Sequence, residues 1–186
     1  LLIVRVVRHV KVHIAMAFGL GLAFLAYLSL AITGGSAPLW MLVAAFTLLA
    51  AGIAIAETLS NDVIIASVPP AKAGAASAVS ETAYEVGAVL GTSVLGGVLT
   101  ASYRSGMVVP EGATAEQAHA ARETLAGAVN VSNELEAGGM TAQAQTLLES
   151  AFHAFDAGST VTSAVGAVLM VGAIFLALRM VGKASA

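Results

Sequence analysis

Residues 77–91 read SAVSETAYEVGAVLG and place two glutamates, Glu81 and Glu85, inside a stretch that is otherwise apolar enough to cross a membrane. An ionised side chain at the centre of a bilayer costs about 2.5–3.5 kcal/mol on insertion scales. We therefore expect both acids to face a cavity, a partner helix or each other, and not lipid.

The composition of the whole chain points to a membrane protein. The 186 residues are 58% hydrophobic and 10% charged, with a mean hydropathy of +0.90, whereas soluble domains are about 45–50% apolar and about 25% charged. The net charge of -3 provides no basic surface for nucleic acid. The absence of cysteine excludes disulfides and thiolate metal sites.

Four segments have the length of a membrane span, which takes about 20 mostly apolar residues. Gly34-Gly35 follows the first segment and Pro69-Pro70 follows the second, and both pairs interrupt helices. The sequence therefore predicts an all-α membrane protein with four transmembrane helices at 12–33, 38–67, 75–101 and 159–181. Because the chain lacks an initiator methionine and its first residues do not form a signal peptide, we expect Leu1 to be an internal point of a longer chain and the sequence to be a fragment.

The positions of the basic residues predict the orientation, because cytoplasmic loops collect lysine and arginine. With four alternating spans, six basic residues fall on one side of the membrane: Arg5, Arg8, Lys11, Lys72, Arg179 and Lys183. We therefore expect a multi-pass membrane protein with residues 1–11, 68–74 and 182–186 in the cytoplasm and the loop 102–158 outside.

The long loop 102–158 carries helix signals. Thr114 and Gln117 fit a capping box, which begins a helix that we expect to run to about residue 136. Gly138-Gly139 then breaks the pattern, and Thr141 can cap a second helix to about residue 157. The loop is thus predicted to be a helical hairpin, with a disordered loop as the alternative.

Helix geometry brings Glu81 and Glu85 together, since residues four apart lie on one face. Two carboxylates so close repel each other when both are ionised, so the pair is suited to taking up and releasing protons. Such a pair can couple proton flow to transport or neutralise a bound cation, and Tyr84 beside it can contact an aromatic cargo. The alternative is a structural hydrogen-bonded pair that holds another helix.

Polar residues of the second span are weaker candidates for the site, and a pair of glycines is a candidate for helix packing. Glu57 and Asn61 on the second span are also four residues apart, and Asp62 is turned about 100° from Asn61. These residues can add to the site, or Asp62 can instead reach the membrane surface. The spacing Gly87-x-x-x-Gly91 permits close helix packing.

Motifs of enzymes and cofactor sites are absent. His9 and His13 are four residues apart, but no third ligand accompanies them, and no phosphate loop, nucleophile elbow or zinc motif is present. We therefore expect no metal, no cofactor and no enzyme activity.

Residues 67–99, SVPPAKAGAASAVSETAYEVGAVLGTSVLGGVL, resemble the thirteenth-helix region of the fourteen-helix drug/proton antiporters of the major facilitator superfamily. In that family, a Pro-x-x-x-x-Gly turn precedes a helix with two acids one turn apart, and Gly-x-x-x-Gly follows. Glu81 and Glu85 match the acids, and Gly87 and Gly91 match the glycines. Some members carry a third acid where this sequence has Ser80.

The resemblance extends over about residues 12–183 and implies that the chain is the C-terminal part, helices eleven to fourteen, of a larger exporter of the cell inner (plasma) membrane, whose N-terminal helices are missing here. It implies proton-coupled efflux of lipophilic, often cationic drugs, with the membrane acids serving both proton and cargo. Two other classes stay open. A non-transporting scaffold or sensor would use the acids only to pair helices, and an intramembrane enzyme would use them as acid and base.

Overall fold

The computed structural model describes residues 11–181, and within this range every regular element is a helix. Four helices are long and apolar enough to cross a membrane, so the chain is an all-α membrane protein as expected. The elements are α2 (Val12–Thr33), η1 (Gly34–Ser36), α3 (Leu39–Ala66), η2 (Pro70–Lys72), α4 (Ala73–Gly106), α5 (Ala115–Glu123), α6 (Leu125–Ala137), α7 (Thr141–Leu176) and η3 (Ala177–Val181).

Glycine and proline set the ends of the first helices. Gly34 stops α2 with a φ of 52°, a conformation that favours glycine. Pro38 precedes α3 as its N-cap, and Pro70 opens the short turn η2 that leads into α4. α2 covers the first expected segment, whereas α4 extends beyond the expected 75–101 at both ends.

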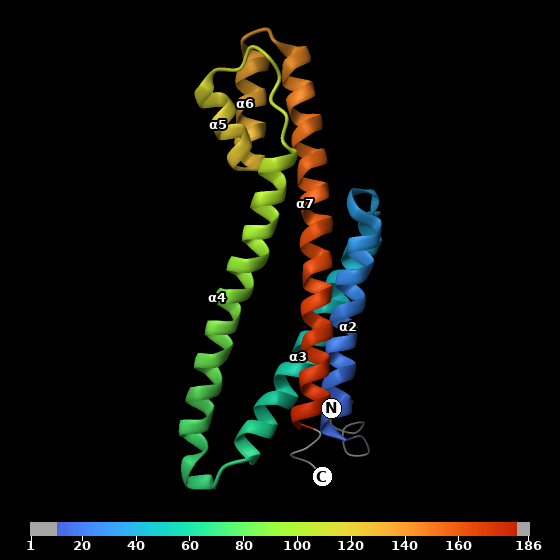
Figure 1. The fold of residues 1–186 in the computed structure, drawn as a ribbon, viewed down its shortest axis with the longest axis vertical. Coiled ribbons are helices and arrows are strands. Elements are labelled where there is room, and N and C mark those ends of the chain that lie inside the picture. Colours follow the sequence, from blue (N-terminus) through green and yellow to red (C-terminus); the bar gives the residue numbers. More distant parts are fainter. Residues whose placement is uncertain (1–10, 182–186) are drawn as a thin grey trace.

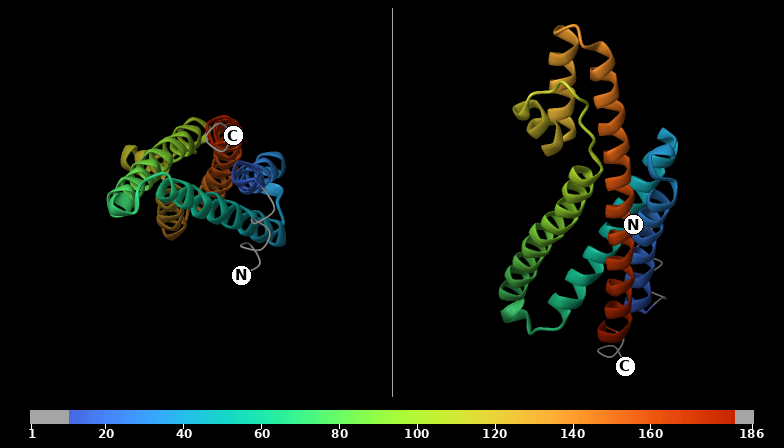
Figure 2. Two further views of the ribbon diagram at one scale, coloured as in Figure 1. Left: turned by 90° about the horizontal axis from the view of Figure 1, so that it is seen from below. Right: turned by 45° about the horizontal axis from the view of Figure 1, so that its top comes forward.

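The long helices form an open bundle (Figures 1 and 2). α2 packs against α3 and α7, and α4 packs against α7. The contact between α4 and α7 lies near the end of α4, where Gly158 faces Leu99 and Gly106 faces Ala154. The opposite half of α4 diverges from α7 and lies nearer to α3 (Figure 1).

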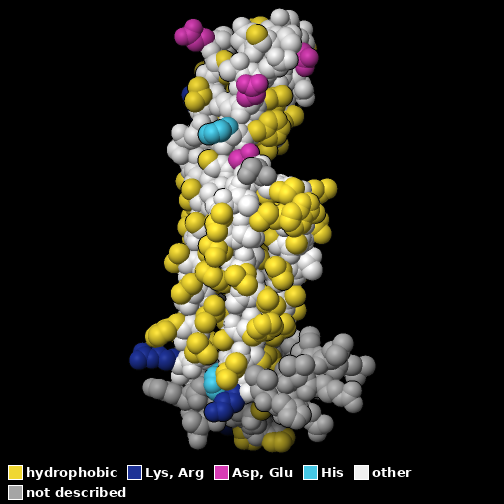
Figure 3. Space-filling model, turned by 90° about the vertical axis from the view of Figure 1, so that its right-hand side faces the viewer, with side chains coloured by type: hydrophobic (Ala, Val, Ile, Leu, Met, Phe, Trp, Pro, Cys, Tyr) yellow, Lys and Arg dark blue, Asp and Glu magenta, His cyan; other side chains and the backbone are white. Residues whose placement is uncertain are grey.

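The outside of the bundle is apolar. Phe18, Leu39, Trp40 and Val168 are each more than 60% exposed, which a soluble monomer rarely tolerates over a large area. On the face shown in Figure 3, hydrophobic side chains cover the middle of the molecule, acidic side chains lie towards one end, and basic ones lie at the other. This distribution matches an apolar belt in contact with lipid.

A compact helical unit, which we call the cap, stands on one end of the bundle and consists of α5, α6 and the first part of α7, residues 141–155 (Figure 1). Its core contains Leu135 and Leu147, which are fully buried, together with Tyr103 from the end of α4. Ser132 donates a hydrogen bond to the Ala144 carbonyl at 3.2 Å and thereby joins α6 to α7. The cap is therefore a packed structure and not a disordered loop.

The cap differs from the expected hairpin in two respects. Residues 114–136 form two helices, because Thr124 is extended and accepts a hydrogen bond from the Gly127 amide, which caps a new helix. α7 runs without interruption from Thr141 through Gly158, so that the second cap helix and the last membrane helix are one. The capping box of Thr114 and Gln117 is present as predicted, whereas Thr141 is the first residue of α7 and caps nothing with its side chain.

The Tyr103 hydroxyl fastens α4 to the cap, because it donates a 2.8 Å hydrogen bond to the buried carbonyl of Ala121. We expect Tyr103→Phe to weaken the cap by about 0.5–1.5 kcal/mol. Hydrogen exchange of the α5 amides in the full chain should then accelerate roughly two- to tenfold. Ser105→Ala is the control, since Ser105 is exposed and bonds only within its own helix. Equal exchange in Tyr103→Phe and wild type would contradict this role.

Candidate functional site

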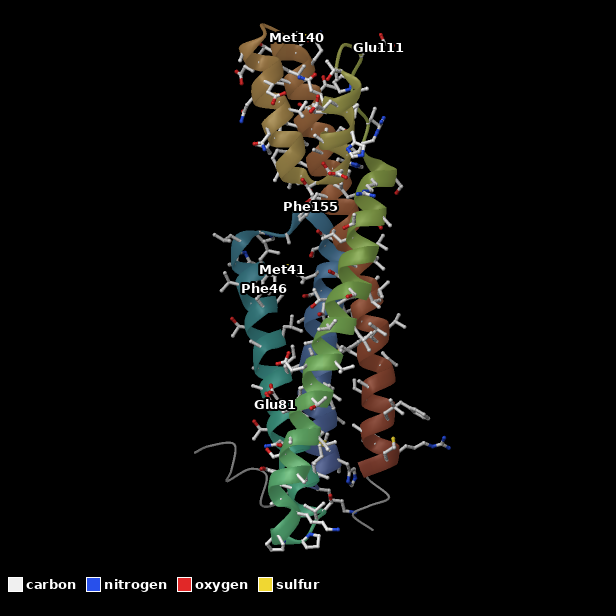
Figure 4. All side chains as sticks on the ribbon, turned by 90° about the vertical axis from the view of Figure 1, so that its left-hand side faces the viewer. Met41, Phe46, Glu81, Glu111, Met140 and Phe155 are labelled. Carbon is white, nitrogen blue, oxygen red and sulfur yellow. The ribbon has the colours of Figure 1, made fainter. Side chains whose placement is uncertain are left out.

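The acidic pocket is a cavity of about 830 Å³ that opens between α2, α3, α4, α7 and η3. Its polar wall is made by Glu57 and Ser60 from α3 and by Glu81, Tyr84 and Glu85 from α4. Three of the four acids that the sequence places in or near the spans thus line one cavity. Figure 4 shows Glu81 on the half of α4 that is remote from the cap.

Helix geometry explains this convergence. Glu81, Glu85 and Ala88 lie on one face of α4, three or four residues apart, and all three line the pocket. Glu57 lines the same pocket from α3, and the Tyr84 hydroxyl donates a 3.2 Å hydrogen bond to the backbone carbonyl of Glu57. Tyr84 therefore ties the two acid-bearing helices together at the level of the site.

The rest of the wall is apolar and rich in methionine. Met16 comes from α2, Met170 from α7 and Met180 from η3. Methionine is flexible and polarizable and adapts to ligands of different shape. No sequence pattern indicates these three residues, because they are far apart in the chain and only the tertiary packing brings them together.

The carboxylates of Glu57, Glu81 and Glu85 are exposed to the pocket and unpaired within residues 11–181. No hydrogen bond or ion pair joins any of these carboxylates to another described residue, whereas Glu123 in the cap pairs with Arg104 and His119. These three acids therefore have no partner of opposite charge among the described residues. Among the described residues, no cluster of three potential metal ligands is present.

Two of the residues that the sequence analysis proposed for the site lie outside the acidic pocket. Asn61 and Asp62 are not among its lining residues, and Asp62 is exposed near the end of α3. This exposed position near the end of α3 is compatible with the alternative that Asp62 reaches the membrane surface.

The proposed glycine packing face has no partner among the described residues. A Cβ added at Gly87 or Gly91 would meet no atom within 4 Å, so these glycines make no close helix contact within residues 11–181. The close crossing of the bundle lies instead between Gly19 and Gly52, where a Cβ at Gly19 would lie 2.8 Å from the Gly52 carbonyl oxygen. Ser80 is buried, and its hydroxyl has no partner among the described groups.

Comparisons with known proteins find relatives named for efflux and for resistance. The chain is 42% identical over 173 residues to the multidrug efflux pump LfrA of Mycolicibacterium smegmatis, a match that covers 93% of this chain and 34% of that protein. It is 32% identical over 157 residues to the methyl viologen resistance protein SmvA of Salmonella typhimurium, covering 84% of this chain and 31% of that protein.

No family model matches the chain, and no solved structure matches it. The chain spans about one third of the length of the curated relatives that it matches. Over most of its own length, it is therefore similar to a part of proteins named for multidrug efflux and for methyl viologen resistance.

Proposed function

We propose that this chain is the C-terminal part of a proton-coupled multidrug exporter of the major facilitator type, which exchanges lipophilic cations for protons. The observation that carries the proposal is the acidic pocket. Three unpaired carboxylates from two helices meet there in an otherwise apolar cavity. The names of the relatives, one a multidrug efflux pump and one a methyl viologen resistance protein, support the same function.

The pocket has the properties that a hydrophobic cation requires. Its volume of about 830 Å³ lies within the range of small-molecule sites, about 300–1,000 Å³. Methionine side chains from three elements can repack around cargoes of different shape. The Tyr84 ring can contact a cation or an aromatic cargo, an interaction worth about 0.5–2 kcal/mol. The carboxylates supply the opposite charge.

Competition for the same carboxylates explains the coupling to protons. A protonated carboxyl group no longer attracts a cation, so the proton and the cargo exclude each other at Glu81 and Glu85. Because binding linkage is reciprocal, each ligand weakens the binding of the other by the same factor. Proton entry from outside thus releases the cargo, and proton release to the cytoplasm prepares the site for the next one.

The proposed orientation places the cap outside the cell and the opposite end of the bundle in the cytoplasm. Lys11, at the start of α2, Lys72, in the turn before α4, and Arg179, in η3, lie at this opposite end, as the positive-inside rule requires of cytoplasmic segments. The acidic pocket then lies in the cytoplasmic half of the membrane, where it can collect cargo from the cell interior or the inner leaflet.

The test is transport by the purified full-length protein in proteoliposomes. With an imposed pH gradient and no ATP, we expect ethidium to move against the proton flow, and a protonophore should abolish this movement. Protein-free liposomes under the same gradient are the control. Ethidium movement that persists after the gradient is collapsed would refute proton coupling. The absence of both binding and transport would favour the scaffold or sensor.

A further inference from the structure

A second cavity, the junction pocket, lies where the cap meets the bundle. It has a volume of about 480 Å³, is lined by residues of α2, η1, α3, α4 and α7, and shares no lining residue with the acidic pocket. Leu99 of α4 borders it, eighteen residues beyond Glu81, which corresponds to about 27 Å along the helix. The two pockets therefore lie at opposite ends of the bundle.

One carboxylate, that of Asp156, enters the junction pocket from α7. It lies directly against Gly35 of η1, where an added Cβ would overlap the carboxylate atoms, so the glycine turn makes room for this acid. No hydrogen bond or ion pair joins the Asp156 carboxylate to another side chain that the structure describes. Arg104 is paired with Glu123 at 3.7 Å, and none of the described lysine and arginine residues lines the pocket.

Aromatic side chains form much of the remaining wall: Tyr27 from α2, Phe46 from α3 and Phe155 from α7. Figure 4 shows Phe155 at the base of the cap and Phe46 on the nearby part of α3, both far from Glu81. The rings attract cations through their faces. The hydroxyls of Thr160 and Thr162 donate to carbonyls of their own helix and leave oxygen lone pairs as acceptors.

An unpaired carboxylate, aromatic walls and the absence of basic lining groups together select a hydrophobic organic cation. We propose that the junction pocket is a second binding site for such cations, which the cargo occupies after it leaves the acidic pocket and before it reaches the outside. This inference rests on the proposed function. Because Asp156 is exposed, its attraction is screened by water, and the site holds the cargo weakly enough to release it.

Photolabelling of the full-length protein in membranes tests this site. With an azido derivative of ethidium, we expect labelled peptides around Phe46 and Phe155, in addition to peptides of the acidic pocket, and unlabelled ethidium should compete with both. In Asp156→Asn, which removes the charge and keeps the shape, labelling at the junction should fall roughly three- to fivefold. In the double variant Glu81→Gln/Glu85→Gln, labelling at the junction should persist while labelling at the acidic pocket falls.

Glu149→Gln is the matched control, since Glu149 is an exposed acid of α7 that lines neither pocket. It should leave both labelled regions unchanged. Labelling restricted to the acidic pocket, or junction labelling that Asp156→Asn does not reduce, would overturn the second site and leave the proposed function intact. Labelling of neither pocket would overturn both.

Discussion

Cells that express the full-length protein with Glu81→Gln or Glu85→Gln should lose ethidium efflux by about tenfold or more, at unchanged expression. Each substitution keeps the size of the side chain and removes both the charge that holds the cation and the group that carries the proton. A charge-assisted contact in a partly dry site is worth about 1.5–3 kcal/mol, which corresponds to at least a tenfold effect. The measurement is the rate of ethidium loss from preloaded cells after energisation.

Asp62→Asn provides a matched control for this experiment. Asp62 is an acid of the neighbouring helix α3 at the same end of the bundle, but it does not line the acidic pocket. We therefore expect near-normal efflux from this variant. If the two glutamine variants export ethidium like the wild type, the glutamates are structural, and the scaffold or sensor becomes the better hypothesis.

The sequence predicted the long helices well because membrane spans depend on local composition. About 20 apolar residues in succession are enough to identify a span, and α2 and α3 begin and end near the glycine and proline residues that mark their limits. The cap was harder to predict. The N-cap at Thr124 gives only a weak local signal, and α7 continues through Gly158, which packs closely against Leu99 of α4.

The site was predictable only in part, because local spacing along a helix can be inferred from the sequence and tertiary packing cannot. The i, i+4 spacing of Glu81 and Glu85 is a local property, and the structure places both side chains at one pocket. The separation of Glu57 from Asp62 depends on which face and which turn of α3 meet α4. The contributions of Met16 and Met170 depend on the packing of α2 and α7. Neither can be deduced from spacing along a single helix.

The second large effect is expected at the crossing of α2 and α3. A Cβ at Gly52 would overlap the Gly19 carbonyl oxygen and lie 2.9 Å from the Ala23 amide nitrogen, and backbone atoms cannot move aside as a flexible side chain can. Gly52→Leu should therefore push the two helices apart, at a cost of about 1–3 kcal/mol or more. Thermal stability of the full-length protein in detergent, followed by the fraction that stays monodisperse after heating, measures this loss.

The same substitution should also impair transport, because α2 and α3 supply Met16, Ile53 and Glu57 to the acidic pocket. Gly21→Leu is the matched control: Gly21 is on α2, two residues from Gly19, and an added Cβ there would meet no atom within 4 Å. A loss of stability and export in Gly52→Leu, with both retained in Gly21→Leu, would identify the crossing as the support of the pocket. If Gly52→Leu proves as stable and active as the wild type, the packing of α2 against α3 does not depend on this close approach. The shape of the acidic pocket would then be maintained by α4, α7 and η3.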